Sequence, residues 1–598
     1  IIKNFVDLGY HSVANAYKEY KKNVRLKKKT TLENINVASS IDEYMEGSDW
    51  RVKANANQEY SLGGLILNVA GKVMANYWLS NLYEQKDIGN AHRCGDFHIH
   101  DLDMLSGYCA GWSLRTLLDE GFNGVDRKIS SSPPKHLSSA IGQMVNFLGT
   151  LQNEWAGAQA FSSFDTYLAP FIRIDNLQYE EVKQCIQEFI YNLNIPSRWG
   201  NQTPFTNVTL DWCVPDDLKS INPKIGGKVI EDFTYGDLSK EMGMINKAFI
   251  EVMLKGDSNG RVFTFPIPTY NITKDFDWDG ENVDILFKMT AKYGTPYFQN
   301  FINSDLEPHM VRSMCCRLQL DLQELVKRGN GLFGSAEQTG SIGVVTLNLP
   351  RLGFIYKGDK QNLYRRLDYL LGLAKTSLEI KRNVIQKWID DGFLPYTKRY
   401  LGTLRNHFST IGINGMNECV LNFFSGGEDI TTNAGKEFAL EIIQYIREKL
   451  VDFQVETGHM YNLEATPAEG AMYRFAREDK KRYKDIIQQG DDEVSYYTNS
   501  TQHQVGWTND LFKSLEHQEQ FQREYTGGTV FHVFVGERIE SAESCKQLVR
   551  KILTNFKIPY ITITPVFSIC PKHGYLAGEH YYCPICDKEV ENEQETGV

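Results

Sequence analysis

The densest group of metal-binding side chains lies near the C-terminus of the chain. Cys570-Pro-Lys-His573 and Cys583-Pro-Ile-Cys586 are two pairs of candidate ligands, each with two residues between its members. This spacing lets one tight turn direct two donors at the same ion, and two such turns complete a tetrahedron. Four thiolate and imidazole donors favour a structural Zn²⁺ site over a catalytic one. The sequence therefore predicts a zinc ion bound by these four residues, with His580 as an alternative to His573.

Three other cysteines have neighbours that suit thiol chemistry. Cys315 and Cys316 are adjacent in Arg312-Ser-Met-Cys-Cys-Arg-Leu318, and neighbouring arginines favour the reactive form of a thiol. Cys109 lies in Ser106-Gly-Tyr-Cys-Ala-Gly-Trp112, where small neighbours allow another backbone or a ligand to come close. Each also has a structural interpretation, because vicinal cysteines can be incidental and a single cysteine is often a small buried hydrophobe.

Polar segments elsewhere could bind phosphate or ribose. Thr466-Pro-Ala-Glu-Gly470 predicts a helix start with proline in its first turn and backbone N–H groups that can bind an anion. A capping box between Thr466 and Glu469 explains the same residues without a ligand. A second polar loop is Ser197-Arg-Trp-Gly-Asn-Gln-Thr203. The candidate substrate-binding residues are Thr466, Ala468, Glu469, Gly470, Ser197, Arg198, Asn414 and Glu418.

Composition limits the kind of protein that carries these residues. Of 598 residues, 42% are hydrophobic and 23% charged, which excludes a disordered chain that could not bury enough apolar surface. The net charge is −11, whereas a nucleic-acid-binding protein carries a basic surface. No apolar run reaches the length of a membrane span, and most of the eleven cysteines are scattered singly. We therefore expect a large cytoplasmic enzyme that contacts neither membrane nor nucleic acid.

The elements that must position these residues alternate between long helices and short apolar strands. The hydrophobic pattern predicts one helix over 60–90, ending near Gly89, and another over 134–155. Alternation and β-branched runs predict strands at 97–100, 205–210, 262–265, 342–349 and 529–534. Short strands separated by long helices indicate a parallel-rich α/β architecture.

Six motifs occur in an order that matches a known family. They are Gly95-Asp-Phe-His-Ile-His-Asp-Leu-Asp103 leading to Tyr108-Cys109, Met314-Cys-Cys-Arg317, Gly340-Ser-Ile-Gly-Val-Val-Thr-Leu-Asn-Leu-Pro-Arg351, Glu464-Ala-Thr-Pro-Ala-Glu-Gly470, Tyr497-Thr-Asn-Ser500 and the two C-terminal ligand pairs. From about residue 50 to 586 the chain resembles anaerobic (class III) ribonucleoside-triphosphate reductases, which are glycyl-radical enzymes.

The resemblance implies a fold and a reaction. The fold would be a ten-stranded α/β barrel in which a central finger loop carries the radical cysteine, followed by a C-terminal zinc module. Cys316, with Cys315 as the alternative, would form the thiyl radical, and Cys109 on the opposite wall would donate hydrogen. The reaction would reduce ribonucleoside triphosphates, with either formate or a thiol as the reductant. Deoxynucleotide effectors would bind at a dimer interface near the helix that carries Gln143, Asn146 and Gln152.

The two ends of the chain depart from the complete family pattern. Residues 1–30 predict a connector helix that resembles the end of an ATP-cone, a regulatory nucleotide-binding module. Residues 31–555 would form the catalytic barrel and 556–598 the zinc module. The family's Arg-Val-x-Gly-Tyr radical motif does not follow the second ligand pair, so we expect the radical glycine outside this sequence. The resemblance also implies a homodimer, ATP or deoxynucleotide effectors and an activating radical-SAM enzyme.

Two other enzyme classes compete with this interpretation. His98 and His100 have the spacing of two ligands on one face of a strand, as in metal-dependent barrel hydrolases. No convincing set of later histidine and aspartate ligands follows them. Another glycyl-radical enzyme, of the formate-lyase type, would lack both the zinc module and the ATP-cone-like start. A pure binding scaffold is disfavoured because several separate motifs carry reactive thiols or phosphate-type loops.

Overall fold

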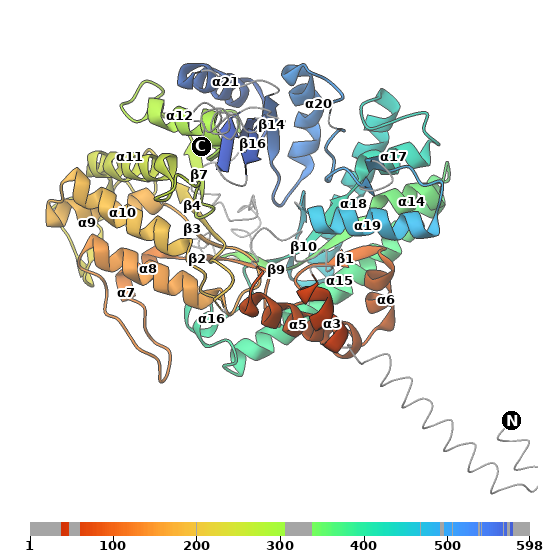
Figure 1. Ribbon diagram of the computed structural model, residues 1–598, viewed down its shortest axis with the longest axis horizontal. Helices are drawn as coiled ribbons and strands as arrows, with labels where there is room; N and C mark the ends of the chain where they lie inside the picture. Colours follow the sequence, from red (N-terminus) through yellow and green to blue (C-terminus); the bar gives the residue numbers. More distant parts are fainter. Residues whose placement is uncertain are drawn as a thin grey trace, which may run out of the picture.

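A large mixed sheet organises the chain in this computed structural model. The structure describes residues 37–46, 60–198, 200–304, 338–466, 468–490, 495–504, 506–535, 539 and 541–565, and the backbone of 567–570 and 574–577. Helices cover the outside of the sheet on both sides, and the strands lie between them (Figure 1). The predicted mixed α/β class is therefore confirmed.

Eleven strands of the described chain form the main sheet. Their order is β11-β10-β9-β2-β3-β4-β7-β8-β15-β14, and β1 pairs with β9 beside this path. β2, β3, β4, β7 and β8 are mutually parallel, as are β9, β10 and β11, and also β14 and β15. The strand bounds are β1 Phe97–Ile99, β2 Cys109–Trp112, β3 Gln159–Phe161, β4 Thr206–Leu210, β7 Ile267–Ile272, β8 Tyr297–Asn300, β9 Gly340–Asn348, β10 His407–Asn414, β11 Met460–Glu464, β14 Phe531–Val535 and β15 Tyr560–Pro565.

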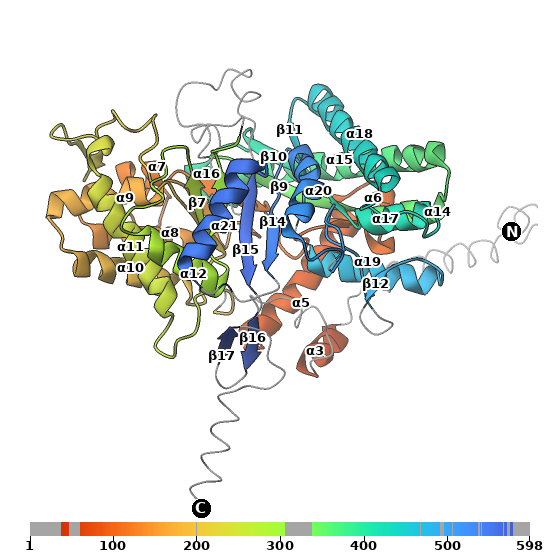
Figure 2. The same cartoon turned by 90° about the horizontal axis from the view of Figure 1, so that it is seen from above.

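The pairings divide the ten-strand path into two halves that run in opposite directions. β2 pairs antiparallel with β9, and β8 pairs antiparallel with β15, so the strand direction reverses at both junctions. All nine residues of β9 are buried, which is typical of a strand covered on both faces. Figure 2 shows β14 and β15 side by side between the two groups of helices.

The expected closed barrel is wrong in one respect. The terminal strands β11 and β14 form no ladder with each other within the described residues. Instead the Gly527 N–H donates to the Leu463 carbonyl at 2.7 Å, and the Ala465 N–H donates to the Gly528 carbonyl at 2.8 Å. The edge of β11 therefore bonds to the turn before β14, because the chain crosses this edge before the strand begins at Phe531. The barrel is therefore open, although hydrogen bonds to this turn bring its two edges close together.

The helices follow the apolar periodicity of the sequence. On α8, Leu137, Ala140, Ile141, Met144 and Leu148 recur at helical spacing and are buried. The helix bounds are α3 Val37–Met45, α5 Leu62–Tyr77, α6 Lys86–Cys94, α7 Leu114–Glu120, α8 Leu137–Leu151, α9 Phe164–Asp175, α10 Tyr179–Leu193, α11 Ser239–Lys255, α12 Val283–Tyr293, α14 Leu349–Ile355, α15 Lys360–Asp390, α16 Pro395–Tyr400, α17 Met416–Phe423, α18 Asn433–Thr457, α19 Glu469–Arg482, α20 Leu511–Glu524 and α21 Ala542–Asn555.

Two predicted elements need correction. The helix expected over 60–90 is two helices, and the second ends at Gly95, whose φ of 79° forms a left-handed cap, rather than at Gly89. The strand expected at 262–265 is absent from the described structure. The Thr264 and Phe265 N–H groups donate to the side-chain oxygen of Asn194 instead of to a neighbouring strand. The strand starts later, at Ile267.

Several predicted features lie outside the described residues. These are the connector helix over 1–30, Cys315, Cys316 and three of the four predicted zinc ligands, His573, Cys583 and Cys586. For the fourth, Cys570, the structure gives only the backbone, at the end of β16 Phe567–Cys570. It pairs antiparallel with Gly574, the first residue of β17 Gly574–Ala577. None of the described helices combines the length and apolar character needed to cross a membrane.

Candidate active site

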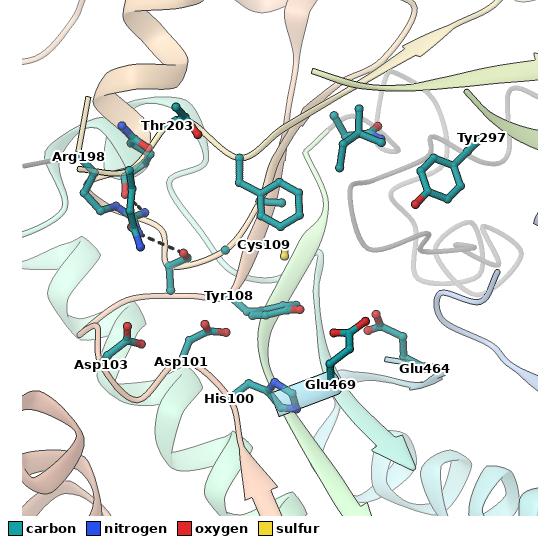
Figure 3. A pocket seen from close by; sticks show the side chains of 18 of the residues that line it. His100, Asp101, Asp103, Tyr108, Cys109, Arg198, Thr203, Tyr297, Glu464 and Glu469 are labelled. Atoms are coloured by element: carbon teal, nitrogen blue, oxygen red, sulfur yellow. Dashed lines mark hydrogen bonds between the residues drawn. The ribbon is translucent and has the colours of Figure 1, made fainter. Parts of the chain in front are cut away.

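A cavity of about 430 Å³ lies where the two halves of the sheet meet. One half contributes strand beginnings, with Cys109 on β2 and Tyr297 on β8. The other half contributes Glu464, at the end of β11, and the start of α19 at Glu469. Figure 3 shows these side chains on facing walls of the cavity. The opposite strand directions therefore bring polar strand ends from both halves to one place.

Cys109 is held tightly at the cavity wall. Its residue is 1% exposed, and its backbone pairs with Ser341 of β9. A Cβ atom at Gly157 would lie 3.0 Å from Cys109 Sγ, and one at Gly340 would lie 2.2 Å from the Cys109 carbonyl oxygen. A side chain at position 157 would therefore press on the thiol, and one at position 340 would press on the backbone of Cys109. Cys109 is thus buried, as a structural cysteine would be, but it also faces the cavity (Figure 3).

The segment that precedes Cys109 forms one wall of the cavity. We call residues 100–108 the floor segment; His100, Asp101, Asp103 and Tyr108 of this segment line the cavity. The His100 Nε2 atom lies 2.8 Å from Thr346 Oγ1. Burial, with a smaller contribution from Lys381, lowers the pKa of His100 to about 3. His100 is therefore neutral at physiological pH and acts as a hydrogen-bonding group.

The hydrolase alternative receives no support from this wall. His98 Nδ1 lies 3.0 Å from Arg474 Nη1, a cation that would oppose metal binding. The rings of His98 and His100 pack edge to face, with centroids 4.7 Å apart. Among the described residues there is no group of three or more histidine, cysteine or acidic side chains that could hold a metal ion.

Arg198 is the cation among the described lining residues of the cavity. Its guanidinium donates to the carbonyls of Gln152 and Trp155, and to Gln202 Oε1 at 3.0 Å. Burial lowers the pKa of Arg198 to about 10, so it remains charged. Its neighbour Ser197 accepts a hydrogen bond from the Gln152 side chain. The predicted polar loop is therefore joined to the C-terminal end of α8 at the edge of the cavity.

The start of α19 presents an open helix N-terminus. The N-cap position is Ala468, which has no polar side chain, and Glu469 is the first helical residue. Thr466 Oγ1 is buried and has no hydrogen-bond partner within the described residues, so the alternative capping box does not form. A Cβ atom at Gly470 would meet no atom within 4 Å. The first turn therefore retains backbone N–H groups and space for an anion.

Of the eight predicted substrate residues, Arg198 and Glu469 line the cavity, whereas Thr466, Ala468, Gly470 and Ser197 only adjoin them in the chain. The other two, Glu418 and Asn414, have different partners. Glu418 is fully buried on α17, where its carboxylate accepts hydrogen bonds from the Thr498 N–H at 2.8 Å and the Thr498 hydroxyl at 2.7 Å. Asn414 Oδ1 accepts a hydrogen bond from the Ser500 N–H at 3.3 Å. Both residues hold the segment around Thr498, which explains their polarity without a ligand.

The three predicted effector residues lie in different surroundings along α8. Asn146 is exposed, and the Gln143 side chain donates to the Ser132 carbonyl at 2.9 Å. Gln152 follows the last helical turn, is 2% exposed and lines the cavity beside Arg198. The first two can contribute to an external site, whereas Gln152 belongs to the cavity.

Sequence reasoning missed three prominent side chains of the cavity. Glu464 is fully buried and lies in a motif that we used only from Thr466 onward; its place at the end of an apolar strand was the available signal. The rings of Tyr297 and Tyr560 stack with centroids 5.4 Å apart. Their two strands are far apart in the sequence, and no local pattern predicts that β8 and β15 pair.

The sequence matches a protein family and several known relatives. Residues 54–595 match the anaerobic ribonucleoside-triphosphate reductase family. A protein of that name from Haemophilus influenzae is 23% identical over 525 residues, covering 82% of this chain and 71% of the relative. A second, from enterobacteria phage T4, is 22% identical over 495 residues, covering 75% of each chain.

Solved structures show the same fold. The anaerobic ribonucleotide reductase from Thermotoga maritima with glycerol in its active site has a TM-score of 0.72 at 22% identity, covering 92% of this chain and 89% of that one. The same enzyme in complex with dATP and CTP also has a TM-score of 0.72, at 21% identity, covering 95% and 94%. Since the family match spans nearly all of the sequence, the chain belongs to the anaerobic ribonucleoside-triphosphate reductase family.

Proposed function

We propose that this protein reduces ribonucleoside triphosphates to deoxyribonucleoside triphosphates in the cavity at Cys109. The observation that carries the proposal is a buried thiol facing a cavity that also has charged side chains on its walls, with Arg198 and the start of α19 among them. The family to which the chain belongs catalyses this reaction. The Thermotoga relative has been solved with CTP and dATP bound, which supports nucleotides as ligands here as well.

The chemistry explains why a buried thiol is needed. Loss of an unactivated ribose 2′-hydroxyl is very slow, and the glycyl-radical chemistry that the family resemblance implies supplies activation at C3′. Cys316, or Cys315, would carry the thiyl radical that removes the C3′ hydrogen. Once water has left C2′, the Cys109 S–H bond breaks and a C–H bond forms at C2′. Formate, oxidised to CO₂, or thiols, oxidised to a disulfide, would then return a hydrogen atom to the Cys109 sulfur and, with a proton, an electron to the ketone left at C3′. The cysteine that removed the C3′ hydrogen would give it back and become a thiyl radical again.

The chain's own groups can position such a substrate. The start of α19, with Thr466, Ala468, Glu469 and Gly470, offers backbone N–H groups and the positive end of the helix dipole to the phosphates. Arg198 forms the neighbouring wall, and Ser197 beside it in the chain is bonded to Gln152 of the same wall. The carboxylates of Asp101 and Glu464 can accept hydrogen bonds from ribose hydroxyls. Asn414 and Glu418 would act indirectly, by holding the 495–500 segment.

Allosteric regulation would reach the cavity along α8. We place the deoxynucleotide effector on the outward face of this helix, near Gln143 and Asn146, at the interface of a homodimer. At the other end of α8, Gln152 bonds to Ser197 and Arg198. A shift of α8 would therefore move the substrate loop directly, because the two are joined by hydrogen bonds.

The proposed function also requires partners and a second module. A radical-SAM enzyme would activate the protein, in the cytoplasm. A structural zinc ion would be held by Cys570, His573, Cys583 and Cys586, whose spacing is that of two ligand knuckles. The described backbone supports the first knuckle, since Cys570 ends β16 and its partner Gly574 begins β17.

The direct test is anaerobic turnover of the activated protein. Cys109→Ala should abolish conversion of CTP to dCTP, because no hydrogen can then be delivered to C2′. Cys545→Ala is the matched control: Cys545 is equally buried, but it lies on α21 and does not line the cavity. Equal turnover by both variants would contradict the proposed role of Cys109.

A further inference from the structure

A lysine is buried beneath the floor segment without a hydrogen-bond partner. Lys381 lies on α15, is 1% exposed, and its Nζ atom has no partner among the described residues. The side chain passes across β9 at Gly343, where a Cβ atom would lie 3.0 Å from Lys381 Cδ and 3.3 Å from Nζ. The ammonium is 5.9 Å from the centre of the Trp78 ring. A side chain at position 343 would therefore press on this path.

The same groups that surround Lys381 fix the floor segment. Trp78 Nε1 donates to the Met104 carbonyl at 2.9 Å, one residue beyond Asp103. The His100 N–H bonds to the Val344 carbonyl of β9 at 3.0 Å, and the Tyr108 N–H to the Ser341 carbonyl at 3.2 Å. Both ends of the floor segment are therefore attached to β9, on either side of the position that Lys381 crosses.

The charges around Lys381 belong to the active site. Burial lowers the pKa of the Lys381 ammonium, and Asp101 and Asp103 of the floor segment and Cys109 of β2 oppose this effect. The same two aspartates also raise the pKa of Arg198, against the larger lowering by burial. Figure 3 shows Asp101 and Asp103 on one wall with Arg198 nearby. Two buried cations thus face two carboxylates next to the proposed hydrogen-donating thiol.

Burial of the Lys381 charge costs folding free energy, which a functional role would explain. A buried ammonium loses its hydration, and a well-packed apolar residue of similar size is often equally stable or more stable. The described lining of the cavity contains four carboxylates, Asp101, Asp103, Glu464 and Glu469, against the single guanidinium of Arg198. Without a further cation, such a cavity would repel a triphosphate.

We propose that Lys381 is a positioning residue of this active site, whose buried charge offsets the carboxylates of the floor segment beside Cys109 and so suits the cavity to an anionic substrate. The inference rests on the proposed function, since it assumes that a nucleotide occupies the cavity. Lys381 does not line the cavity, so it acts through the floor segment and does not touch the substrate.

The test is Lys381→Met, which keeps the length of the side chain and removes its charge. Lys375→Met is the matched control on the same helix, where Lys375 pairs with Glu456 at the surface at 2.7 Å. We expect the Lys381→Met protein to melt at the same or a higher temperature, yet to bind CTP at least about tenfold more weakly by calorimetry, which needs no radical. A lysine with only a structural role would instead lower the melting temperature and leave CTP affinity unchanged.

The pH profile of turnover gives a second, independent readout. Burial lowers the pKa of Lys381, so kcat/KM of the wild-type protein should fall on the alkaline side as the ammonium loses its proton, and the Lys381→Met protein should lack this alkaline limb. His100 faces the same ammonium but stays neutral, because burial is the main cause of its low pKa. Cys109 and Arg198 remain beside the carboxylates in both proteins.

A second variant displaces the ammonium without deleting it. Gly343→Ala places a methyl group against Lys381 Cδ and Nζ, so it should change CTP affinity and the alkaline limb in the same direction as Lys381→Met, by a smaller amount. Wild-type affinity and an unshifted profile in both variants would overturn the role of Lys381. Failure of the wild-type protein to bind CTP at all would overturn the proposed function instead.

Discussion

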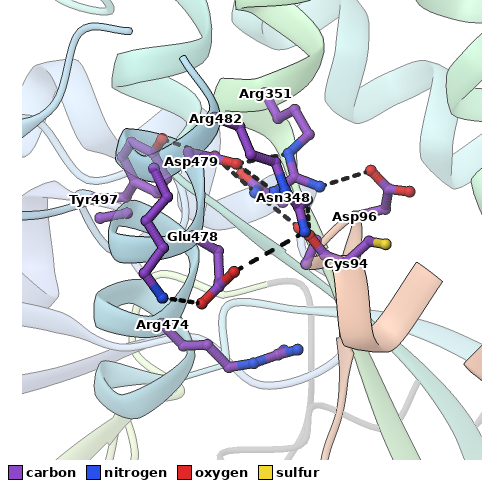
Figure 4. Close-up of polar contacts among 12 residues, drawn as sticks. Cys94, Asp96, Asn348, Arg351, Arg474, Glu478, Asp479, Arg482 and Tyr497 are labelled. Carbon is purple, nitrogen blue, oxygen red and sulfur yellow. Dashed lines mark hydrogen bonds and ion pairs between the residues drawn. The ribbon is translucent and has the colours of Figure 1, made fainter. Parts of the chain in front are cut away.

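Replacing Asp479 with Asn should loosen the helix whose N-terminus lies at the cavity. Asp479 is fully buried on α19 and accepts hydrogen bonds from Arg351 Nε at 2.6 Å, Asn348 Nδ2 at 2.9 Å and the Tyr497 hydroxyl at 2.8 Å. Arg351 also pairs with Asp96 at 2.9 Å. Figure 4 shows how this group joins α19 to β9, to the segment before β1 and to Tyr497.

The magnitude follows from the burial of the pair. The side chains of Arg351 and Asp479 are 4% and 0% exposed, and breaking a buried pair by removing one charge costs about 3–5 kcal/mol. Burial alone would lower the pKa of Arg351, but in the wild-type protein Asp479 and Asp96 together raise it. A guanidinium is not deprotonated in proteins, so the variant retains a buried charge. Since Asp96 remains as a partner and Asn keeps one acceptor oxygen, we expect the lower end, about 3 kcal/mol.

Hydrogen exchange of the α19 peptide is the suitable assay, because a chain of this size need not unfold in one step. A loss of about 3 kcal/mol corresponds to exchange that is faster by about a hundredfold in α19. Glu441→Gln is the matched control, since Glu441 pairs with Lys360 at 2.6 Å and both side chains are about half exposed. Unchanged exchange in α19 of the Asp479→Asn protein would refute the claim that this pair anchors the helix.

Two further predictions concern the metal and a buried acid. Protein purified without chelator should contain about one equivalent of zinc per chain, and Cys583→Ser should lose it; less than half an equivalent in the wild type would contradict the four-ligand site. Burial, reinforced by Asp211, raises the pKa of Asp165 to about 7, above its ordinary value of 3.8. The folded protein therefore binds this proton more tightly, and its contribution to stability is full below about pH 4 and is lost as the pH rises through 7. Urea midpoints measured from pH 5 to 8 should fall less steeply in Asp165→Asn, and parallel slopes would contradict this assignment.

Local patterns in the sequence predicted those parts of the fold that depend on local interactions. The strands at Phe97, Thr206 and Gly340 were predicted correctly because β-branched and alternating residues favour extended backbone. The 262–265 strand was wrong because its N–H groups bond to Asn194, which is about 70 residues away. Closure of the sheet could not be predicted, since it depends on how one edge meets the turn at Gly527.

The candidate site likewise contains residues that local motifs predicted and residues that they did not. Cys109, Arg198 and Glu469 were predicted from local motifs, and the fold brings them to one cavity. Glu418 had similar motif support, but it satisfies the backbone of a loop. Lys381 gave no signal in the sequence, because an isolated lysine in a long helix is normally solvated. Its significance depends on Gly343 and the floor segment, which only the folded chain brings against it.

The central claim is that Cys109 donates hydrogen to a nucleotide radical formed in this cavity. The most direct measurement follows CTP deuterated at C3′ in anaerobically activated protein, with the glycyl radical quantified by electron paramagnetic resonance. Cys109→Ala should retain the radical and still exchange the C3′ label or release the base, yet form no dCTP. Cys316→Ala should retain the radical and do neither, and Cys315→Ala should be much milder. Formation of dCTP by Cys109→Ala at the wild-type rate would contradict the claim.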